Sequence, residues 1–253
     1  MKVFISVVLI IATFGFSAYV EAVPMVIDGY KSELYASGLT LPSSLSFDDD
    51  GNLWLVGDRL GAAPVFRLSP SGTFEQRTTQ EAAGTHMHVQ PYDGGVCGIR
   101  SEATMPPEVF VLPENETVPQ VVTNLSGYEA PNVRVQNTTT KSTDGTPIHA
   151  RHVRLDDDDT RPLLMWIHGG PFSVWGDVWH WRWNPVVAAS FGYHVVCPNP
   201  RGSTGFGQKF IDDMFGDVWG GQCFEDVIAV ADDASNREDV NGDRSCAMGG
   251  SFG

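Results

Sequence analysis

The sequence predicts a two-domain protein, with a β-rich first half and an α/β second half built on a mainly parallel sheet. In the first half, short β-type runs are separated by Gly, Pro and Asp turns about every eight to twelve residues, which is typical of antiparallel sheets. In the second half, apolar strands alternate with helical segments, which is typical of parallel strands joined by crossovers. A Gly-x-Ser-x-Gly motif directly follows the last apolar strand, at residues 249–253.

Composition bounds the possible functions. The chain has 253 residues, 42% of them hydrophobic and 19% charged, so it has enough apolar material for one large or two modest folded units. Its formal net charge of -15 argues against nucleic acid as a partner, because such a surface repels phosphate backbones. The four cysteines have no metal-binding or redox spacing.

The N-terminus has the layout of a secretory signal peptide, predicted at residues 1–22. Lys2 precedes an apolar stretch over residues 3–19, and small residues follow near Ala22. We therefore expect a secreted protein without stable membrane insertion after cleavage; the alternative is an anchor formed by the same apolar segment, although it is short for a spanning helix. Three glycosylation triplets fit the secreted interpretation; they begin at Asn115, Asn124 and Asn137.

Residues 23–131 are predicted to form a partial, propeller-like β domain. Its clearest strands are residues 53–56, 64–68, 96–99 and 109–112. A propeller blade takes about 40 to 50 residues and a closed ring needs at least about four blades, so roughly 110 residues provide two or three blades.

Residues 132–253 are predicted to form the α/β domain. An entry hairpin (133–139 and 147–155) turns at Asp144-Gly145 and is followed by an apolar strand at 163–167. The remaining elements are a short helix at 185–191, stopped by Gly192, a strand at 193–197, a helix at 224–234 and a strand at 246–248.

The motif around Ser251 is typical of the nucleophile elbow of an α/β-hydrolase. A nucleophilic serine in this fold sits on a tight strand-to-helix turn in a strained backbone conformation, and small neighbours allow the strand and helix to approach closely. The motif alone is weak evidence in a chain with 27 glycines, but here it follows an apolar strand at the end of a β/α array.

A second motif, His168-Gly169-Gly170-Pro171, follows another apolar strand and predicts an oxyanion loop. We expect the oxyanion hole to be formed by the N–H groups of Gly170 and Phe252. His168 is expected to brace this loop by hydrogen bonding, since the chain order of the triad in this fold is serine, acid, histidine.

Five motifs in order resemble the catalytic domain of the prolyl oligopeptidase family, closest to its acylaminoacyl-peptidase and dipeptidyl-aminopeptidase-like branch. They are residues 166–171, 199–208, 219–221, 225–226 and 249–253. The resemblance implies an α/β-hydrolase domain capped by an N-terminal β-propeller, and cleavage of short peptides through an acyl-enzyme on Ser251. It also implies that the loop containing Arg201 supports the active site. Acyl transfer needs no metal or organic cofactor.

The chain departs from the family by stopping directly after the nucleophile, so we expect an incomplete α/β-hydrolase fragment without the triad Asp and His. Asp226, Asp232 and His194 precede the serine and are in the wrong chain order to replace them. The chain alone is therefore expected to be inactive, with the strand at 246–248 exposed as a sheet edge.

Two alternatives remain open at this stage. An esterase or lipase-like hydrolase shares the elbow and the oxyanion loop, and a non-catalytic secreted β-binding module would carry the hydrolase part as a remnant. Four tryptophans after the oxyanion loop are expected in the core or in a pocket wall; they are Trp175, Trp179, Trp181 and Trp183. The choice between exopeptidase and endopeptidase stays open.

Overall fold

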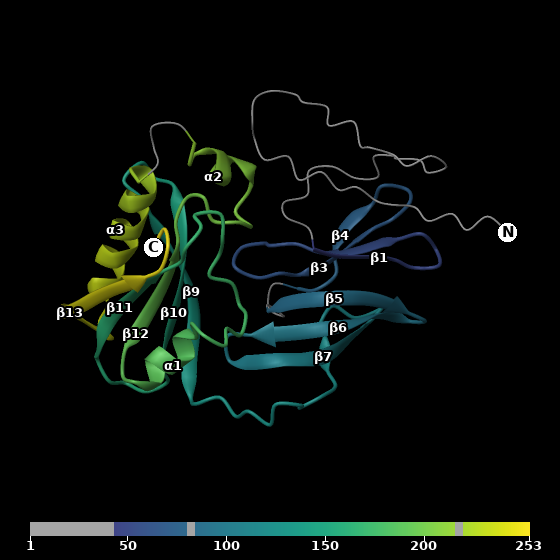
Figure 1. The fold of residues 1–253 in the computed structure, drawn as a ribbon, viewed down its shortest axis with the longest axis horizontal. Coiled ribbons are helices and arrows are strands. Elements are labelled where there is room, and N and C mark those ends of the chain that lie inside the picture. Colours follow the sequence, from purple (N-terminus) through teal and green to yellow (C-terminus); the bar gives the residue numbers. More distant parts are fainter. Residues whose placement is uncertain (1–42, 80–83, 216–219) are drawn as a thin grey trace.

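The computed structural model describes residues 43–79, 84–215 and 220–253. The predicted signal segment at residues 1–22 lies outside these ranges. Two four-stranded antiparallel sheets form one side of the molecule, and a five-stranded sheet with its helices forms the other (Figure 1).

The first sheet is a meander with the order β1-β2-β3-β4. Its strands are β1 (Ser43–Phe47), β2 (Leu53–Val56), β3 (Val65–Leu68) and β4 (Phe74–Gln76). The turn between β1 and β2 is fixed by Asp48, whose carboxylate accepts hydrogen bonds from the backbone of Asn52 and from the indole of Trp54, at 2.8 Å each. An aspartate that ties a tight turn in this way explains why the sequence signal at this turn is strong.

The second sheet repeats this form with the order β5-β6-β7-β8. Its strands are β5 (Thr85–Tyr92), β6 (Gly95–Glu102), β7 (Met105–Pro113) and β8 (Gln120–Val121). One apolar cluster joins the two sheets, with Trp54 and Val65 from the first and Val96 and Phe110 from the second. The two meanders therefore share a core and form one β-rich half.

The third sheet has the order β13-β11-β12-β10-β9. Its strands are β9 (Val133–Lys141), β10 (Pro147–Leu155), β11 (Arg161–Ile167), β12 (His194–Asn199) and β13 (Val240–Gly249). β9, β10 and β12 pair antiparallel, whereas β11 runs parallel to both β12 and β13. The predicted hairpin forms the first two strands of this sheet, but two of its four strand pairings are antiparallel, so the sheet is mixed and not mainly parallel as the sequence predicted.

Helices cover both faces of the third sheet. α3 (Gln222–Ser235) packs Val230 against a cluster that includes Met165 of β11, and α1 (Pro185–Ser190) packs Val186 against the opposite cluster with Val195 of β12. A short third helix, α2 (Gln208–Asp212), lies in the loop after β12 and was not predicted from the sequence.

The parallel pairing of β11 and β13 positions the predicted site. Ile167 and Gly249, the last residues of the two strands, are register partners. The loop that begins at His168 therefore starts beside the turn that begins at Gly250, at the same edge of the sheet.

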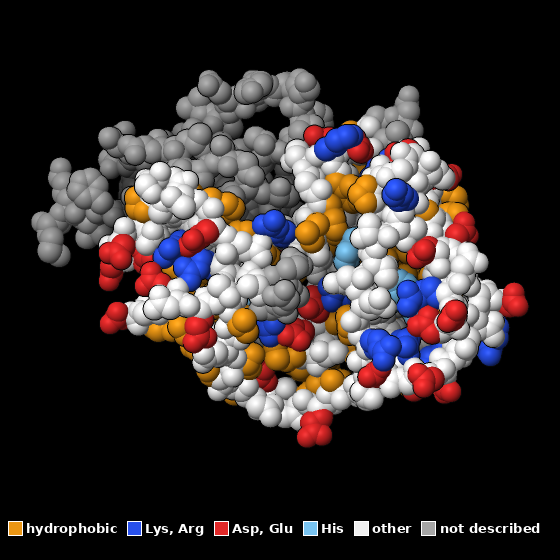
Figure 2. All heavy atoms as spheres, turned by 180° about the vertical axis from the view of Figure 1, so that it is seen from behind, with side chains coloured by type: hydrophobic (Ala, Val, Ile, Leu, Met, Phe, Trp, Pro, Cys, Tyr) orange, Lys and Arg blue, Asp and Glu red, His pale blue; other side chains and the backbone are white. Residues whose placement is uncertain are grey.

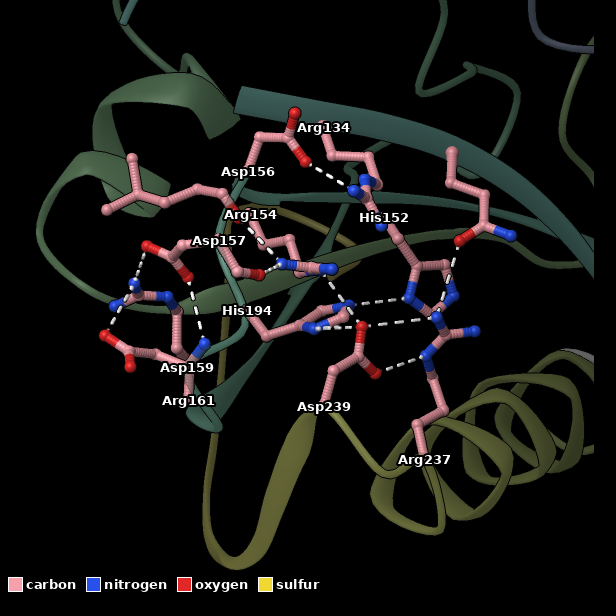
Figure 3. A network of polar contacts seen from close by, with 12 residues as sticks. Arg134, His152, Arg154, Asp156, Asp157, Asp159, Arg161, His194, Arg237 and Asp239 are labelled. Atoms are coloured by element: carbon pink, nitrogen blue, oxygen red, sulfur yellow. Dashed lines mark hydrogen bonds and ion pairs between the residues drawn. The ribbon is translucent and has the colours of Figure 1, made fainter. Parts of the chain in front are cut away.

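A buried polar network lies near the C-terminal end of α3 (Figure 3). His152 Nδ1 and His194 Nε2 are 2.9 Å apart, and His152 Nε2 is 3.0 Å from Thr138 Oγ1. Asp239, just before β13, forms ion pairs with Arg154 and Arg237, with 3.0 Å between each Nε and a carboxylate oxygen. Burial lowers the pKa of both histidines, of His152 to about 3 and of His194 to about 4, so the pair is neutral at pH 7.

The surface carries its acidic excess in a dispersed form. On the face shown in Figure 2, acidic side chains are scattered over both halves, and many lie beside Lys or Arg. Among the described residues, no helix is both long and apolar enough to span a membrane.

Candidate active site

Ser251 lies on a sharp turn after β13, in the left-handed region with φ of 65°. Non-glycine residues seldom adopt this conformation, and strain of this kind is concentrated at functional sites. The turn also requires small neighbours, because a Cβ added to Gly249 would lie 2.4 Å from the carbonyl carbon of Gly253. The local geometry therefore has the strained backbone that the sequence predicted for a nucleophile elbow.

The Gly169-Gly170 loop packs directly against this turn. A Cβ added to Gly169 would lie 2.8 Å from the carbonyl oxygen of Gly250 and 3.2 Å from Ser251 Cβ. Gly170 has a φ of 134° and precedes a cis peptide bond to Pro171. The two motifs, about 80 residues apart in the sequence, thus meet at the sheet edge where parallel strands end.

A cavity of about 300 Å³ opens beside Ser251. Its lining includes the predicted site residues His168, Gly169, Gly170 and Ser251, whereas Phe252 and Arg201 do not line it. The rest of the wall is largely apolar and aromatic; it includes Val174, Trp175, Val178, Trp183 and Pro185. A cavity with this lining is suited to an apolar group bound near the serine.

His168 is buried, and both of its ring nitrogens have partners. Nδ1 lies 2.7 Å from the carbonyl oxygen of Gly169, and Nε2 lies 3.0 Å from Ser203 Oγ. Ser203 Oγ also donates to the carbonyl oxygen of Pro200 at 2.6 Å, so its single hydroxyl hydrogen is engaged there and both ring nitrogens of His168 face acceptor oxygens. Burial lowers the pKa of His168, which favours the neutral ring. Both ring nitrogens thus contact groups other than Ser251.

Arg201 connects three segments behind the site. Its guanidinium bonds Asp226 of α3 at 2.7 Å and Asp144 of the β9–β10 turn at 2.6 Å, and Ser142 Oγ donates to Asp226 at 2.6 Å. Arg201 and Asp226 are almost fully buried. This network fixes the start of the loop after β12, and that loop contains Ser203.

Two of the four tryptophans, Trp175 and Trp183, line the cavity, whereas the expectation of a core or wall position is wrong for the exposed Trp181. Trp175 contacts Trp166 in the core and also lines the cavity. Trp183 stacks on His180 at 5.7 Å between ring centroids, and Arg182 lies 4.1 Å from the centre of its ring. Trp181 is largely exposed, and Trp179 contacts it edge-on.

The acids and the histidine that precede Ser251, which chain order excluded from the triad, do not line the cavity. Asp226 bonds Arg201, and His194 pairs with His152. Asp232 is exposed on α3. Among the described residues, the cavity lining contains His168 and His180 but no Asp or Glu.

Sequence reasoning missed three residues at this site. Arg151 on β10 and Ala103 in the β6–β7 turn line the cavity, and Asp58 of the β-rich half contacts the loop behind the oxyanion residues. These residues belong to no local motif and come together only through contacts between segments far apart in the chain, so the sequence carried no signal for them.

Known proteins are similar to part of this sequence and to the fold. Residues 179–253 match the model of the prolyl oligopeptidase family. The probable dipeptidyl-peptidase 5 of Trichophyton verrucosum (strain HKI 0517) is 46% identical over 112 residues, which are 43% of this chain and 15% of that protein. The dipeptidyl-peptidase 5 of Trichophyton equinum is 45% identical over the same length.

Solved structures extend the similarity in fold to the β-rich half. Pyrococcus horikoshii acylaminoacyl peptidase has a TM-score of 0.70 at 18% identity, covering 83% of this chain and 33% of its own. A puromycin-hydrolyzing peptidase of Mycobacterium tuberculosis has a TM-score of 0.62 at 20% identity, covering 82% and 33%. This chain therefore corresponds to about a third of these structures, and its matched segment to a smaller share of the fungal relatives. The sequence matches show that residues 179–253 are similar to the prolyl oligopeptidase family.

Proposed function

We propose that the protein is a serine peptidase that cleaves short peptides through an acyl-enzyme on Ser251. The observation that carries this proposal is the position of Ser251, strained at φ of 65° on the turn after β13 and packed against the Gly169-Gly170 loop at the rim of a cavity. The match of residues 179–253 to the prolyl oligopeptidase family makes acyl transfer the expected reaction for such a serine.

The proposed reaction begins when Ser251 Oγ attacks the peptide carbonyl carbon and its proton passes to a general base. The tetrahedral oxyanion is stabilised by the N–H groups of Gly170 and Phe252, the amine leaves with a proton, and water hydrolyses the resulting ester. His168 is not that base, because Ser203 occupies its Nε2. In this fold the base and its carboxylate follow the serine in the chain, so we assign them to the part of the full-length protein after Ser251.

The names of the fungal relatives suggest a narrower substrate class. We propose that the full-length protein releases dipeptides from the N-termini of short peptides. We further propose that the two four-stranded sheets are blades of a β-propeller that restricts access to Ser251. Their meander form and the fold shared with acylaminoacyl peptidase support this assignment.

The test uses the full-length protein and its Ser251→Ala variant, each with peptide amides and with simple esters. We expect amide hydrolysis with dipeptide products in mass spectrometry, covalent labelling by a fluorophosphonate, and loss of both in the variant. Ester hydrolysis without amide hydrolysis would favour the esterase alternative. A full-length protein that neither reacts with the probe nor cleaves any substrate would favour the non-catalytic module.

We also propose that the protein is secreted. The asparagines of all three glycosylation triplets, Asn115, Asn124 and Asn137, are exposed, and exposure is what an acceptor site in a folded domain requires. Expression of the full-length protein in a secretory eukaryotic host should give a product in the medium whose mass falls after enzymatic removal of N-glycans. An intracellular product without glycans would contradict this proposal.

A further inference from the structure

A loop of the β-rich half, residues 57–61 between β2 and β3, is held between two loops of the α/β half. On one side, Leu60 N donates to the carbonyl oxygen of Gly205 at 3.0 Å. On the other side, the carbonyl oxygen of Gly61 accepts from Asp177 N at 2.8 Å and from Arg151 at 2.9 Å. The loop is therefore hydrogen-bonded to both loops that lie behind the cavity.

Asp58 makes the most direct of these contacts. Thr204 Oγ1 donates to Asp58 Oδ2 at 2.6 Å, and Thr204 itself is almost fully buried. Gly205 allows the close approach, because a Cβ there would lie 3.0 Å from the backbone of Asp58 and Arg59, and its φ of 86° also disfavours other residues. The contact is therefore specified by the backbone as well as by the two side chains.

From Thr204, successive contacts lead to the oxyanion loop. Thr204 N donates to the carbonyl oxygen of Ser173, and its neighbour Ser203 bonds His168 Nε2 at 3.0 Å. His168 Nδ1 then bonds the carbonyl oxygen of Gly169, the residue packed against Ser251. The contact between Ser203 and His168 is buried and the other contacts are partly exposed, and together they connect Thr204 to the loop that carries Gly170.

The other wall of the cavity is fixed to the β-rich half in the same way. Asp177 pairs with Arg151 at 2.7 Å and accepts from Ala103 N at 3.0 Å, and Trp179 N donates to Ser101 Oγ at 2.8 Å. Arg151 and Ala103 both line the cavity. The β-rich half thus contacts the supports of the cavity on two sides.

We propose that Asp58 is a positioning residue for catalysis, which holds the oxyanion loop in place through Thr204, Ser203 and His168. The β-rich half then acts on the active site directly, through the placement of the Gly170 N–H, in addition to any effect on access. This inference rests on the proposed peptidase function. Burial raises the pKa of Asp58, and the hydrogen bond from Thr204 offsets part of this cost of burying the ionised carboxylate.

The experiment compares two matched pairs in the full-length protein. Thr204→Val removes the hydroxyl at nearly constant volume, and Thr204→Ser keeps it. Asp58→Ala removes the acceptor, and Asp58→Asn keeps one. Asp93→Ala, at the exposed β5–β6 turn, is the control for loss of a surface carboxylate. The readouts are kcat and KM for a short peptide, and hydrogen exchange of the peptide covering residues 166–178, followed by mass spectrometry.

We expect Thr204→Val and Asp58→Ala to lower kcat by about tenfold or more with little change in KM, since misplaced transition-state donors reduce kcat and not ground-state binding. Exchange in residues 166–178 should become faster in both. Thr204→Ser and Asp58→Asn should restore values close to those of the natural protein, and Asp93→Ala should leave them unchanged.

Unchanged kcat and unchanged exchange in both Thr204→Val and Asp58→Ala would overturn the inference, as would equal losses in the conservative and the disruptive members of each pair. If Asp58→Ala does not fold, Thr204→Val decides the question, because it leaves Asp58 in place. Hydrogen exchange does not depend on catalysis. An inactive full-length protein would therefore refute the proposed function, while the exchange rates of residues 166–178 would still test the contact between Asp58 and Thr204.

Discussion

At the scale of single residues, Gly169 is where the loop after β11 touches the turn that contains Ser251. Any side chain there would press on the carbonyl oxygen of Gly250 and on Ser251 Cβ, at 2.8 and 3.2 Å. Rotation of a flexible side chain cannot relieve either contact, because the Gly250 oxygen belongs to the backbone and Ser251 Cβ is attached to a strained backbone. The glycine is therefore required by close approach across the site.

Gly169→Ala in the full-length protein should lower kcat by about a hundredfold, because a shift on the order of 1 Å between nucleophile and oxyanion donors has costs of this size. We expect a decrease of about 1–3 kcal/mol in the free energy of unfolding from the same overpacking. Kinetics and urea unfolding measure the two effects. Gly72→Ala, in the open β3–β4 turn where no atom lies within 4 Å of the added Cβ, should leave kcat unchanged; an active Gly169→Ala enzyme would contradict the close approach.

At the scale of elements, Arg201 connects the loop after β12 to α3 and to the β9–β10 turn. Arg201→Met keeps much of the volume but leaves the fully buried carboxylate of Asp226 without its cation. Breaking a buried pair from one side typically costs about 3–5 kcal/mol, so we expect a loss of that order in denaturant unfolding. Lys209→Met, which breaks the exposed pair with Asp213 on α2, should cost less than about 1 kcal/mol. Similar losses in both variants would show that burial of the Arg201 network contributes little.

The elements also show what a single sequence can predict. Strand β2 coincides with the predicted residues 53–56, because a tight turn precedes a run of four buried residues. α2 was missed because five residues in a Gly-rich loop carry too little helical periodicity. β13 begins at Val240, six residues before the predicted start. Polar residues such as Asn241 and Asp243 give no strand signal, although they continue the strand. Local sequence signals therefore predict the central residues of an element but not its irregular ends.

The same division holds for the site. Ser251 and the Gly169-Gly170 loop were predicted because each is a local motif after a strand, and parallel pairing brings them together. Asp58 and Thr204 are 146 residues apart, and neither belongs to a motif that predicts the other. Contacts between the two halves depend on how the folded halves pack against each other, and the hydrophobic pattern of one sequence does not predict that packing.

At the scale of the whole molecule, histidine burial controls the response to acid. Among the described residues, five histidines have pKa values lowered mainly by burial: His86, His149 and His194 to about 4, His152 to about 3, and His168 below its ordinary value. They lie in both halves, so acid acts on both. Asp58 works in the opposite direction, because burial raises its pKa and protonation favours the folded state.

The sign of the effect follows from proton linkage. A histidine with an ordinary pKa near 6.5 in the unfolded chain and near 4 in the folded one binds protons more readily when unfolded. Its contribution to stability is therefore complete above about pH 6.5 and declines as the pH falls toward about 4, by up to about 1.4 kcal/mol per pH unit for each such group. Carboxyl groups with lowered pKa, such as Glu108 at about 2, take effect only at lower pH.

We therefore expect the melting temperature of the full-length protein to fall steeply between pH 6.5 and 4.5. His152→Asn removes one titrating group and breaks the contact with His194, so the variant should be less stable at pH 7.5 but should lose stability less steeply toward acid. Arg154 and Arg237 face the pair and oppose its protonation, whereas Asp239 favours it, and all three remain in the variant. His88→Asn, at an exposed position on β5, should keep the natural slope. The test is a set of melting curves across this pH range in one buffer system. If the melting temperature of the natural protein and of His152→Asn changes equally steeply with pH, the buried histidine pair is not what makes the fold acid-sensitive.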